Sequence, residues 1–243
     1  MWDQHTKWVE EGATPARDIY RGRHGRNTIY FPSIKNRRQV ICESALEANY
    51  CLWLEWDKDV RNYYAQPKTF RWESNGKHLR YTPDFFVTHC TGADHFTEVK
   101  PDFNKTSPTY RATLKAFLRY CDDHGGVFKW ADAYSIKQQT RLDNLRVLYT
   151  NIHRIQPIEC DYCLNFLATQ GPAFTMNELC KSPRAPSLRA ISWAIFCGHL
   201  LADLELPLNL NTSLIKKSDN HEQQIFTQLS VYSTLSERSR PTA

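Results

Sequence analysis

The sequence has no long apolar run and no internal repeat, and these absences exclude several classes of protein. In its 243 residues the longest apolar stretches span only a few positions and have charges nearby, which excludes a membrane span. The first five residues, Met1 to His5, are polar and lack the apolar segment of a signal peptide. We therefore expect a cytoplasmic protein, and a hydrophobic content of 41% indicates a folded core.

The eight cysteines do not indicate disulfides or zinc. Nothing in the sequence points to secretion, so we expect free thiols, most of them in apolar patterns typical of buried side chains. Cys160 and Cys163 form a CxxC pair, but the other cysteines and His199 do not follow the spacing of a zinc site. We therefore interpret the pair as part of a helix.

Basic residues are concentrated near the N-terminus. The whole chain has a formal net charge of only +5, whereas residues 17–40 contain a single acid, Asp18. The basic residues of this stretch are Arg17, Arg21, Arg23, Arg26, Lys35, Arg37 and Arg38. Such a segment is a candidate arm for contacts with phosphates, and a solvated N-terminus without a ligand is the alternative.

The first half of the chain alternates between helical and strand patterns. Apolar residues at helical spacing predict helices over 44–57 and 108–124, and a further helix is expected over 135–149. Shorter alternating segments predict strands, and Asn75–Gly76 predicts a two-residue hairpin turn. We expect an α/β fold here, a mixed sheet flanked by helices that occupies residues 1–151.

The second half consists mainly of short helical patterns. Five elements are expected after residue 151: helices over 157–169, 175–180 and 186–197, and strands over 199–204 and 208–211. Three helices followed by a small hairpin are the outline of a winged helix. We therefore place a mostly α winged-helix domain at residues 152–213 and a polar C-terminal tail at residues 214–243.

Three charged residues on two neighbouring strands form the most informative pattern. Asp84 begins one predicted strand, and Glu98 and Lys100 lie two positions apart on another, so that they project to one face. If these strands pair, the three side chains converge at one end of the sheet. Two carboxylates and the Val99 carbonyl would bind a hard cation such as Mg²⁺. The pattern predicts metal-assisted phosphodiester hydrolysis, with Lys100 stabilising developing charge, and ordinary surface charge is the alternative.

A third carboxylate is expected from the helix that precedes these strands. Glu47 lies beside the apolar face of this helix and can face the sheet, with Glu43 and Glu55 as competing candidates. Ser44 to Glu47 also has the sequence of a capping box, in which Glu47 would only bond the Ser44 amide. Both interpretations of Glu47 stay open at this point.

Other basic residues are candidate DNA contacts, with an exposed polar surface as the alternative. Eight residues form this set: Arg21, Arg23, Arg26, Arg37, Arg38, Arg71, Arg80 and Lys105. In the second half, the expected helix over 186–197 is apolar for a helix that reads DNA. Contact with another protein is therefore an equal alternative for that domain.

In these motifs the sequence resembles TnsA, the endonuclease subunit of heteromeric cut-and-paste transposases, which has a PD-(D/E)XK restriction-endonuclease-like fold. Four motifs carry the resemblance: Ser44–Glu47, Gln66–Pro67, Tyr81–Phe85 and Glu98–Pro101. The resemblance implies that four residues match catalytic positions, namely Glu47, Asp84, Glu98 and Lys100. It also implies Mg²⁺ as the cofactor, with Mn²⁺ as a substitute.

The resemblance further implies a role and partners. TnsA-like proteins cut double-stranded DNA at the 5′ ends of the transposon, on the non-transferred strand. A TnsB-like DDE transposase cuts and joins the 3′ ends, and a TnsC-like AAA+ regulator contacts the complex. The expected location is the prokaryotic cytoplasm, at the nucleoid when the complex is assembled. A stand-alone restriction or repair nuclease and a non-catalytic DNA-bridging module remain alternatives.

Overall fold

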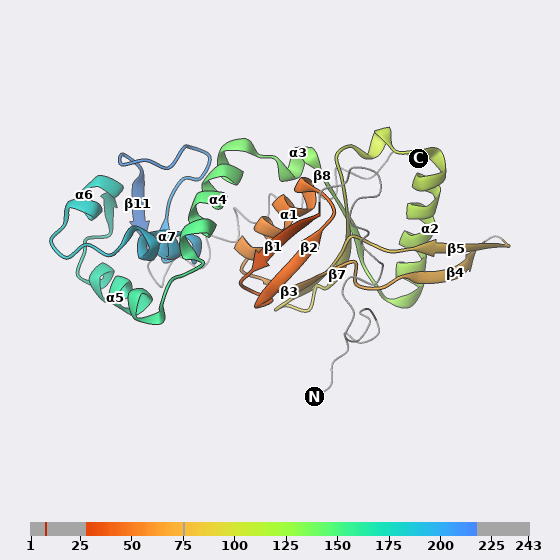
Figure 1. Cartoon of the computed structure of the whole chain (residues 1–243), viewed down its shortest axis with the longest axis horizontal. Helices are drawn as coiled ribbons and strands as arrows, with labels where there is room; N and C mark the ends of the chain where they lie inside the picture. The colour runs from red at the N-terminus through yellow and green to blue at the C-terminus, as the bar shows by residue number, and fades with distance from the viewer. Residues whose placement is uncertain (1–7, 9–27, 75, 218–243) are drawn as a thin grey trace, which may run out of the picture. The chain divides into compact units, whose positions relative to one another are not determined.

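The computed structural model describes residues 8, 28–74 and 76–217, and these divide into two compact units between Ile136 and Lys137. The first unit contains most of the strands, and the second is mainly helical (Figure 1). Helix α4 (Gln139–Ile152) packs against α7 (Leu188–Phe196) and so belongs to the second unit. The division therefore lies earlier than the boundary that we expect after residue 151.

The first unit contains the elements that surround Asp84. Its strands are β1 (Ile29–Ser33), β2 (Arg38–Cys42), β3 (Val60–Ala65), β4 (Phe70–Ser74), β5 (Lys77–Tyr81), β6 (Phe85–His89), β7 (His95–Lys100) and β8 (Phe128–Asp132). Its helices are α1 (Ala45–Trp56), α2 (Pro108–His124) and α3 (Ala133–Ile136), with a 3₁₀ turn at Phe103–Lys105. The expected helices at 44–57 and 108–124 are thus confirmed.

A mixed four-stranded sheet with the order β3–β6–β7–β8 forms the centre of this unit. Strand β6 pairs antiparallel with both β3 and β7, whereas β8 runs parallel to β7 after the α2 crossover. Strands β4 and β5 form a separate hairpin, in which Ser74 pairs with Lys77, the register that the expected two-residue turn requires. This arrangement confirms the expected α/β fold and is consistent with a restriction-endonuclease-like fold.

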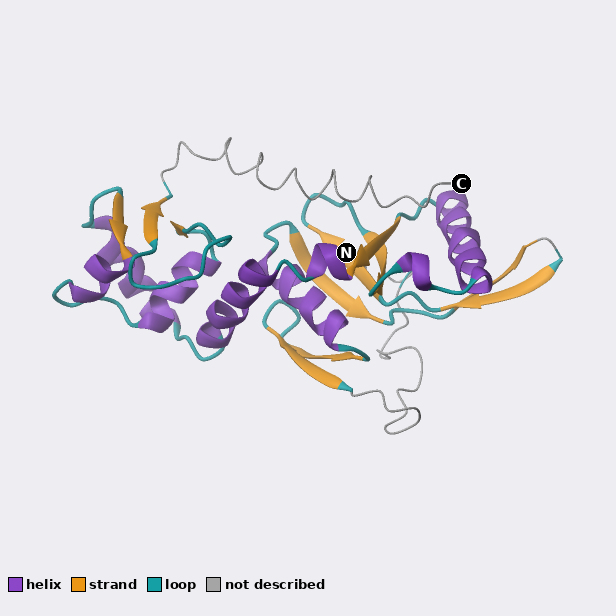
Figure 2. Ribbon diagram, turned by 90° about the horizontal axis from the view of Figure 1, so that it is seen from above, coloured by secondary structure: helices purple, strands orange, loops and turns teal. Residues whose placement is uncertain are grey.

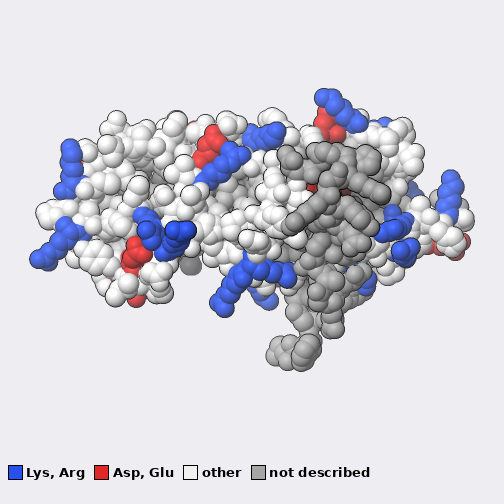
Figure 3. Space-filling model, viewed as in Figure 1, with Lys and Arg blue, Asp and Glu red and all other residues white. Residues whose placement is uncertain are grey.

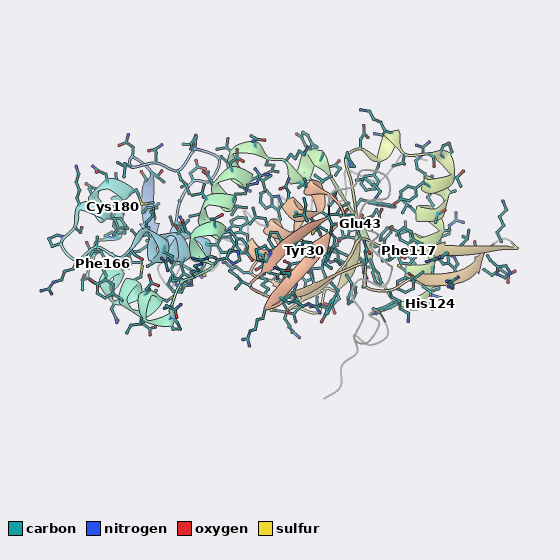
Figure 4. All side chains as sticks on the ribbon, viewed as in Figure 1. Tyr30, Glu43, Phe117, His124, Phe166 and Cys180 are labelled. Atoms are coloured by element: carbon teal, nitrogen blue, oxygen red, sulfur yellow. The ribbon has the colours of Figure 1, made fainter. Side chains whose placement is uncertain are left out.

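Aromatic packing joins α2 to the sheet and to the β4–β5 hairpin. Phe117 of α2, labelled in Figure 4, is fully buried. Its ring centroid lies 4.6 Å from that of Tyr81 and 5.1 Å from those of Phe70 and Phe128. Figures 1 and 2 both show α2 beside this hairpin. The packing holds Tyr81 and α2 against the sheet face that also carries Glu98.

The β1–β2 hairpin differs from the sequence expectation. The sequence pattern assigns Arg37 and Arg38 to a candidate basic arm, whereas the structure has a β-hairpin there. Buried Glu55 of α1 anchors it, because its carboxylate accepts hydrogen bonds from the Ser33 hydroxyl and from the Tyr63 hydroxyl of β3. Glu55 therefore serves this hairpin.

The second unit combines helices with a small antiparallel sheet. Its elements are α4, α5 (Pro157–Ala168), β9 (Ala173–Thr175), α6 (Met176–Lys181), α7, β10 (Leu200–Leu201) and β11 (Ser213–Lys216). Strand β11 lies between β10 and β9. The last strand was expected over 208–211 but includes the first residues of the expected tail. Burial explains this, because Leu214 is fully buried whereas Leu210 is 58% exposed.

The described part of the chain has neither a disulfide nor a helix with the length and apolarity that a bilayer span requires. All eight cysteines are free, and Cys42, Cys51, Cys121 and Cys163 are buried. Cys163 lies on α5 and its thiol is 3.6 Å from the Ala190 carbonyl on α7. This cysteine of the CxxC pair is therefore part of a helix–helix contact.

Candidate active site

Three charged side chains meet where β6 begins and β7 ends. Phe85 pairs with Thr97 in the antiparallel register, so Asp84 lies opposite Glu98, and Lys100 follows on the same face of β7. The Lys100 ammonium lies 2.6 Å from Glu98 Oε1 and 3.4 Å from Asp84 Oδ2. The structure thus brings together the three residues of the PD…ExK pattern.

Asp84 is 6% exposed and is held from two sides. Its Oδ2 atom accepts a hydrogen bond from the Val99 amide at 2.8 Å and another from Lys100. Burial raises the pKa of Asp84 well above its usual value, the nearby charge of Glu98 raises it further, and Lys100 opposes both effects. Positive charge beside Asp84 therefore stabilises its ionised form.

Glu98 is 1% exposed and accepts hydrogen bonds from two tyrosines. Tyr81, the last residue of β5, donates to Oε2, and Tyr110, in the first turn of α2, donates to Oε1. Burial raises the pKa of both hydroxyls, and the charge of Glu98 adds to the effect. Both tyrosines therefore stay protonated at neutral pH and fix the orientation of the Glu98 carboxylate.

Lys100 lies among three oxygen atoms. Besides Asp84 and Glu98, its ammonium contacts the Val99 carbonyl at 3.2 Å, and it lies 5.6 Å from the centre of the Tyr110 ring. Burial by itself lowers the pKa of Lys100, but Asp84 and Glu98 raise it by more, so that the net shift is upward. The ammonium therefore stays charged, and its position is one at which the surrounding oxygen atoms stabilise a cation.

The donor set around this point fits a hard divalent cation. Both carboxylates and the Val99 carbonyl supply oxygen, the donor atom that Mg²⁺ and Mn²⁺ prefer. In the described ranges no group of three or more His, Cys, Asp and Glu side chains is arranged to hold a metal ion. Two carboxylates are nevertheless sufficient for Mg²⁺, which keeps several waters and binds phosphate oxygens of its substrates.

Glu47 lies near Asp84, and its carboxylate takes part in the N-terminal cap of α1. Its Oε2 accepts the Glu43 amide at 2.8 Å, its Oε1 lies 3.0 Å from the Ser44 hydroxyl, and that hydroxyl accepts the Glu47 amide (Glu43 is labelled in Figure 4). The capping arrangement is thus present, with the Glu43 amide in place of the Ser44 amide. Burial raises the pKa of Glu47, and its charge contributes to the raised pKa of Asp84. Glu47 is therefore electrostatically coupled to the site.

Residues 57–133 match the family model described as TnsA-like endonuclease N terminal. This segment is TnsA-like. The match contains Asp84, Glu98 and Lys100 but not Glu47, and it confirms the resemblance seen in the sequence motifs. It indicates a nuclease of Tn7-like transposition. No curated protein matches the chain.

Sequence reasoning did not single out Tyr81 and Tyr110 as site residues of the TnsA-like segment. Tyr81 stands three positions before Asp84, and Tyr110 shares the apolar face of the 108–124 helix. The Tyr110 hydroxyl reaches Glu98 only because α2 packs against the sheet, where Phe117 contacts Phe96 of β7, whereas the Tyr81 hydroxyl reaches Glu98 from the end of β5. The sequence does place a tyrosine on the sheet-facing side of α2. A tyrosine at such a position can be a core residue or a site residue, and the sequence does not distinguish the two.

The candidate DNA contacts are dispersed. Arg21, Arg23 and Arg26 lie outside the described residues. Arg37 and Arg38 are exposed on the β1–β2 hairpin, and Lys105 forms an ion pair with Asp102 at 3.6 Å. Figure 3 shows the lysines and arginines of the described residues spread over one face without forming a single patch.

Arg71 and Arg80 are the exception, because the structure places them side by side. They are directly opposite each other in the β4–β5 register, and both are exposed. Like charges directly opposite in a hairpin are destabilising. Their shared face is opposite to the one that packs on α2, so both guanidinium groups are accessible to an anion.

Proposed function

We propose that the protein is a metal-dependent DNA endonuclease that cuts the 5′ ends of a transposon, on the non-transferred strand. One observation carries the proposal: Asp84, Glu98 and the Val99 carbonyl converge on a single cationic group. The match of residues 57–133 to TnsA-like endonucleases supports the same reaction class. We place the protein in the prokaryotic cytoplasm, at the nucleoid when it is bound to DNA.

Each residue of the site has a role in such hydrolysis. Asp84, Glu98 and the Val99 carbonyl would hold Mg²⁺ or Mn²⁺, which supplies a binding point for the scissile phosphate and acidifies a coordinated water. The tyrosines that donate to Glu98 keep its carboxylate oriented. With a divalent cation at the carboxylates, the Lys100 ammonium would be free to stabilise negative charge at the phosphate. Glu47 helps to order water at the site.

We propose that the β4–β5 hairpin contacts the DNA backbone. Arg71 and Arg80 lie opposite each other on its solvent face, and a phosphate between them relieves their mutual repulsion. The hairpin ends at Tyr81, which contacts Glu98 directly. A phosphate bound on the hairpin is therefore linked by a short stretch of chain to the catalytic carboxylates.

We propose that the second unit is a winged helix that binds a protein partner. The element order α5–β9–α6–α7–β10–β11, with β11 between β10 and β9, supports this assignment. Helix α7 is packed against α4 and α5, and most of its residues are buried, so few of them are available to read bases. The proposed partners are a TnsB-like DDE transposase and a TnsC-like AAA+ regulator.

Strand-specific cleavage of a labelled transposon-end duplex tests the proposal. The reaction contains Mg²⁺, with and without the TnsB-like transposase, and compares the wild type with Asp84→Ala. We expect nicking at the 5′ end that depends on the transposase and is lost in the variant. Efficient cutting without the transposase would indicate a stand-alone nuclease, and binding without any Asp84-dependent cutting would indicate a DNA-bridging module.

A further inference from the structure

Gln66 combines unfavourable features that folding alone does not explain. It is 2% exposed, and its Oε1 atom has no hydrogen-bond partner among the described residues. Its backbone has a φ of +47°, which residues other than glycine rarely adopt, and Pro67 restricts it further. Buried polar atoms nearly always have partners, and strained backbone is concentrated at functional sites. The combination points to a use of this side chain in binding.

Gln66 lies directly beside the candidate cation site. Ala65 pairs with Phe85, and the Gln66 amide donates to the Asp84 carbonyl at 2.8 Å, so Gln66 is the next position of the ladder, opposite Asp84. Asp84 in turn lies opposite Glu98. Gln66, directly after β3, Asp84, directly before β6, and Glu98 on β7 therefore form a row of buried polar residues at this edge of the sheet.

We propose that Gln66 is a positioning residue whose Oε1 atom accepts a hydrogen bond from a water in the hydration shell of the cation at Asp84 and Glu98. The inference rests on the proposed function. Mg²⁺ retains several waters in protein sites, so a water is available to be held. A neutral amide oxygen orients this water without adding a third negative charge beside two buried carboxylates. Groups that orient the ligands of a metal typically change its affinity when they are replaced.

Variants of the full chain separate this role from a structural one. Gln66→Met keeps the length of the side chain but removes the acceptor, Gln66→Glu keeps an acceptor, and Gln66→Gly removes the acceptor at a φ that glycine tolerates. Gln39→Met makes the first change at an exposed glutamine of β2. Two quantities are measured: the affinity for Mn²⁺ alone, by titration calorimetry, and the melting temperature without divalent cation.

We expect Gln66→Met and Gln66→Gly to weaken Mn²⁺ binding roughly ten-fold. Gln66→Met should melt without cation at the same temperature as the wild type or higher, because a buried unpaired acceptor has been removed. Gln66→Glu should retain the affinity, and Gln39→Met should change neither quantity. A lower melting temperature in Gln66→Met together with unchanged Mn²⁺ affinity in both acceptor-free variants would show a purely structural role and overturn the inference.

Asp84→Asn distinguishes this inference from the proposed function. If Asp84→Asn abolishes Mn²⁺ binding while both acceptor-free Gln66 variants bind like the wild type, only the role of Gln66 is rejected. If the wild type binds no Mn²⁺, or if Asp84→Asn leaves its binding unchanged, the cation site is rejected, and the role of Gln66 is rejected with it.

Discussion

Both ends of the β6–β7 hairpin contain buried polar groups, but the two ends are constructed in different ways. At the turn, His89 bridges Asp59 and His95: its Nδ1 lies 2.9 Å from Asp59 Oδ2, and its Nε2 lies 3.2 Å from His95 Nδ1. Thr91 also donates to Asp59 through its amide and its hydroxyl. At the other end, two carboxylates converge on one ammonium.

The difference between the two ends is in the balance of charge. The turn has two partly exposed carboxylates, Asp59 and Asp94, which accept hydrogen bonds from Thr91 and His89. It also has His95, whose pKa is lowered by burial to about 3 and which is therefore neutral. The open end has the buried pair Asp84 and Glu98, and Gln66, whose Oε1 atom has no partner among the described residues, lies opposite Asp84 in the backbone register. A satisfied network stabilises a turn, whereas two buried carboxylates with one lysine favour the binding of a divalent cation.

The largest difference in cleavage rate is expected between variants in which one carboxylate is neutralised, at the open end in one variant and at the turn in the other. Asp84→Asn should lower the rate of DNA cleavage by about a thousand-fold, because a ligand of the cation is lost while the size of the side chain is kept. Asp59→Asn makes the same chemical change at the turn and should leave cleavage within about two-fold of the wild type. The measurement is single-turnover cleavage at saturating Mg²⁺. Equal losses in both variants would contradict the functional division of the hairpin.

Replacing the lysine at the open end should separate cation binding from cleavage. Lys100→Met removes the ammonium that occupies the convergence point, so Mn²⁺ should bind more tightly, while cleavage falls about a hundred-fold because charge at the phosphate is no longer stabilised. Calorimetry and single-turnover cleavage measure the two quantities. Lys129→Met on β8, near His95, is the matched control. Weaker Mn²⁺ binding in Lys100→Met would show that Lys100 supports the ligands and does not compete with the cation.

His95 at the turn should make the free energy of unfolding depend on pH. Unfolded His95 titrates near pH 6.5, whereas burial lowers the pKa of the folded residue to about 3, so between these values only the unfolded chain binds the proton. Its contribution to stability is therefore complete above pH 6.5 and is lost as the pH falls towards 3. Between pH 7.5 and pH 5 the free energy of unfolding should fall by about 2 kcal/mol more in the wild type than in His95→Asn. Urea unfolding measures this, and identical pH profiles would contradict it.

The parts of the site that sequence could predict are those that depend on local periodicity. Glu98 and Lys100 share a face because side chains alternate along a strand, and Asp84 reaches them through a single hairpin. Tyr110 could not be predicted, because its hydroxyl meets Glu98 only after α2 packs across the sheet. The strain at Gln66 could not be predicted either, because a positive φ outside glycine follows from the path of the whole chain.

The fold shows the same limit. Helices α1 and α2 were predictable because each has apolar residues at helical spacing and a serine at its N-cap, Ser44 and Ser107. The β1–β2 hairpin was not, because its strands contain a proline and several exposed polar residues, and it is anchored by Glu55 from the following helix. A strand that is held in place by polar contacts with distant residues cannot be predicted from the hydrophobic pattern of its own sequence.

The smallest effect should come from Glu47, where the cap and the site coincide. Glu47→Gln retains an oxygen for the Glu43 amide, its NH2 group can donate to the Ser44 hydroxyl, and the bond from the Glu47 amide to that hydroxyl is unchanged, so the main change is the loss of the negative charge beside Asp84. If that charge contributes to the site, Mn²⁺ affinity or cleavage should fall about ten-fold, while the melting temperature stays unchanged. Glu178→Gln makes the same change in the capping box of α6, in the second unit, and should alter none of these quantities. Wild-type Mn²⁺ binding and cleavage in Glu47→Gln would mean that Glu47 is only a cap, and that the two carboxylates on β6 and β7 suffice for the cation.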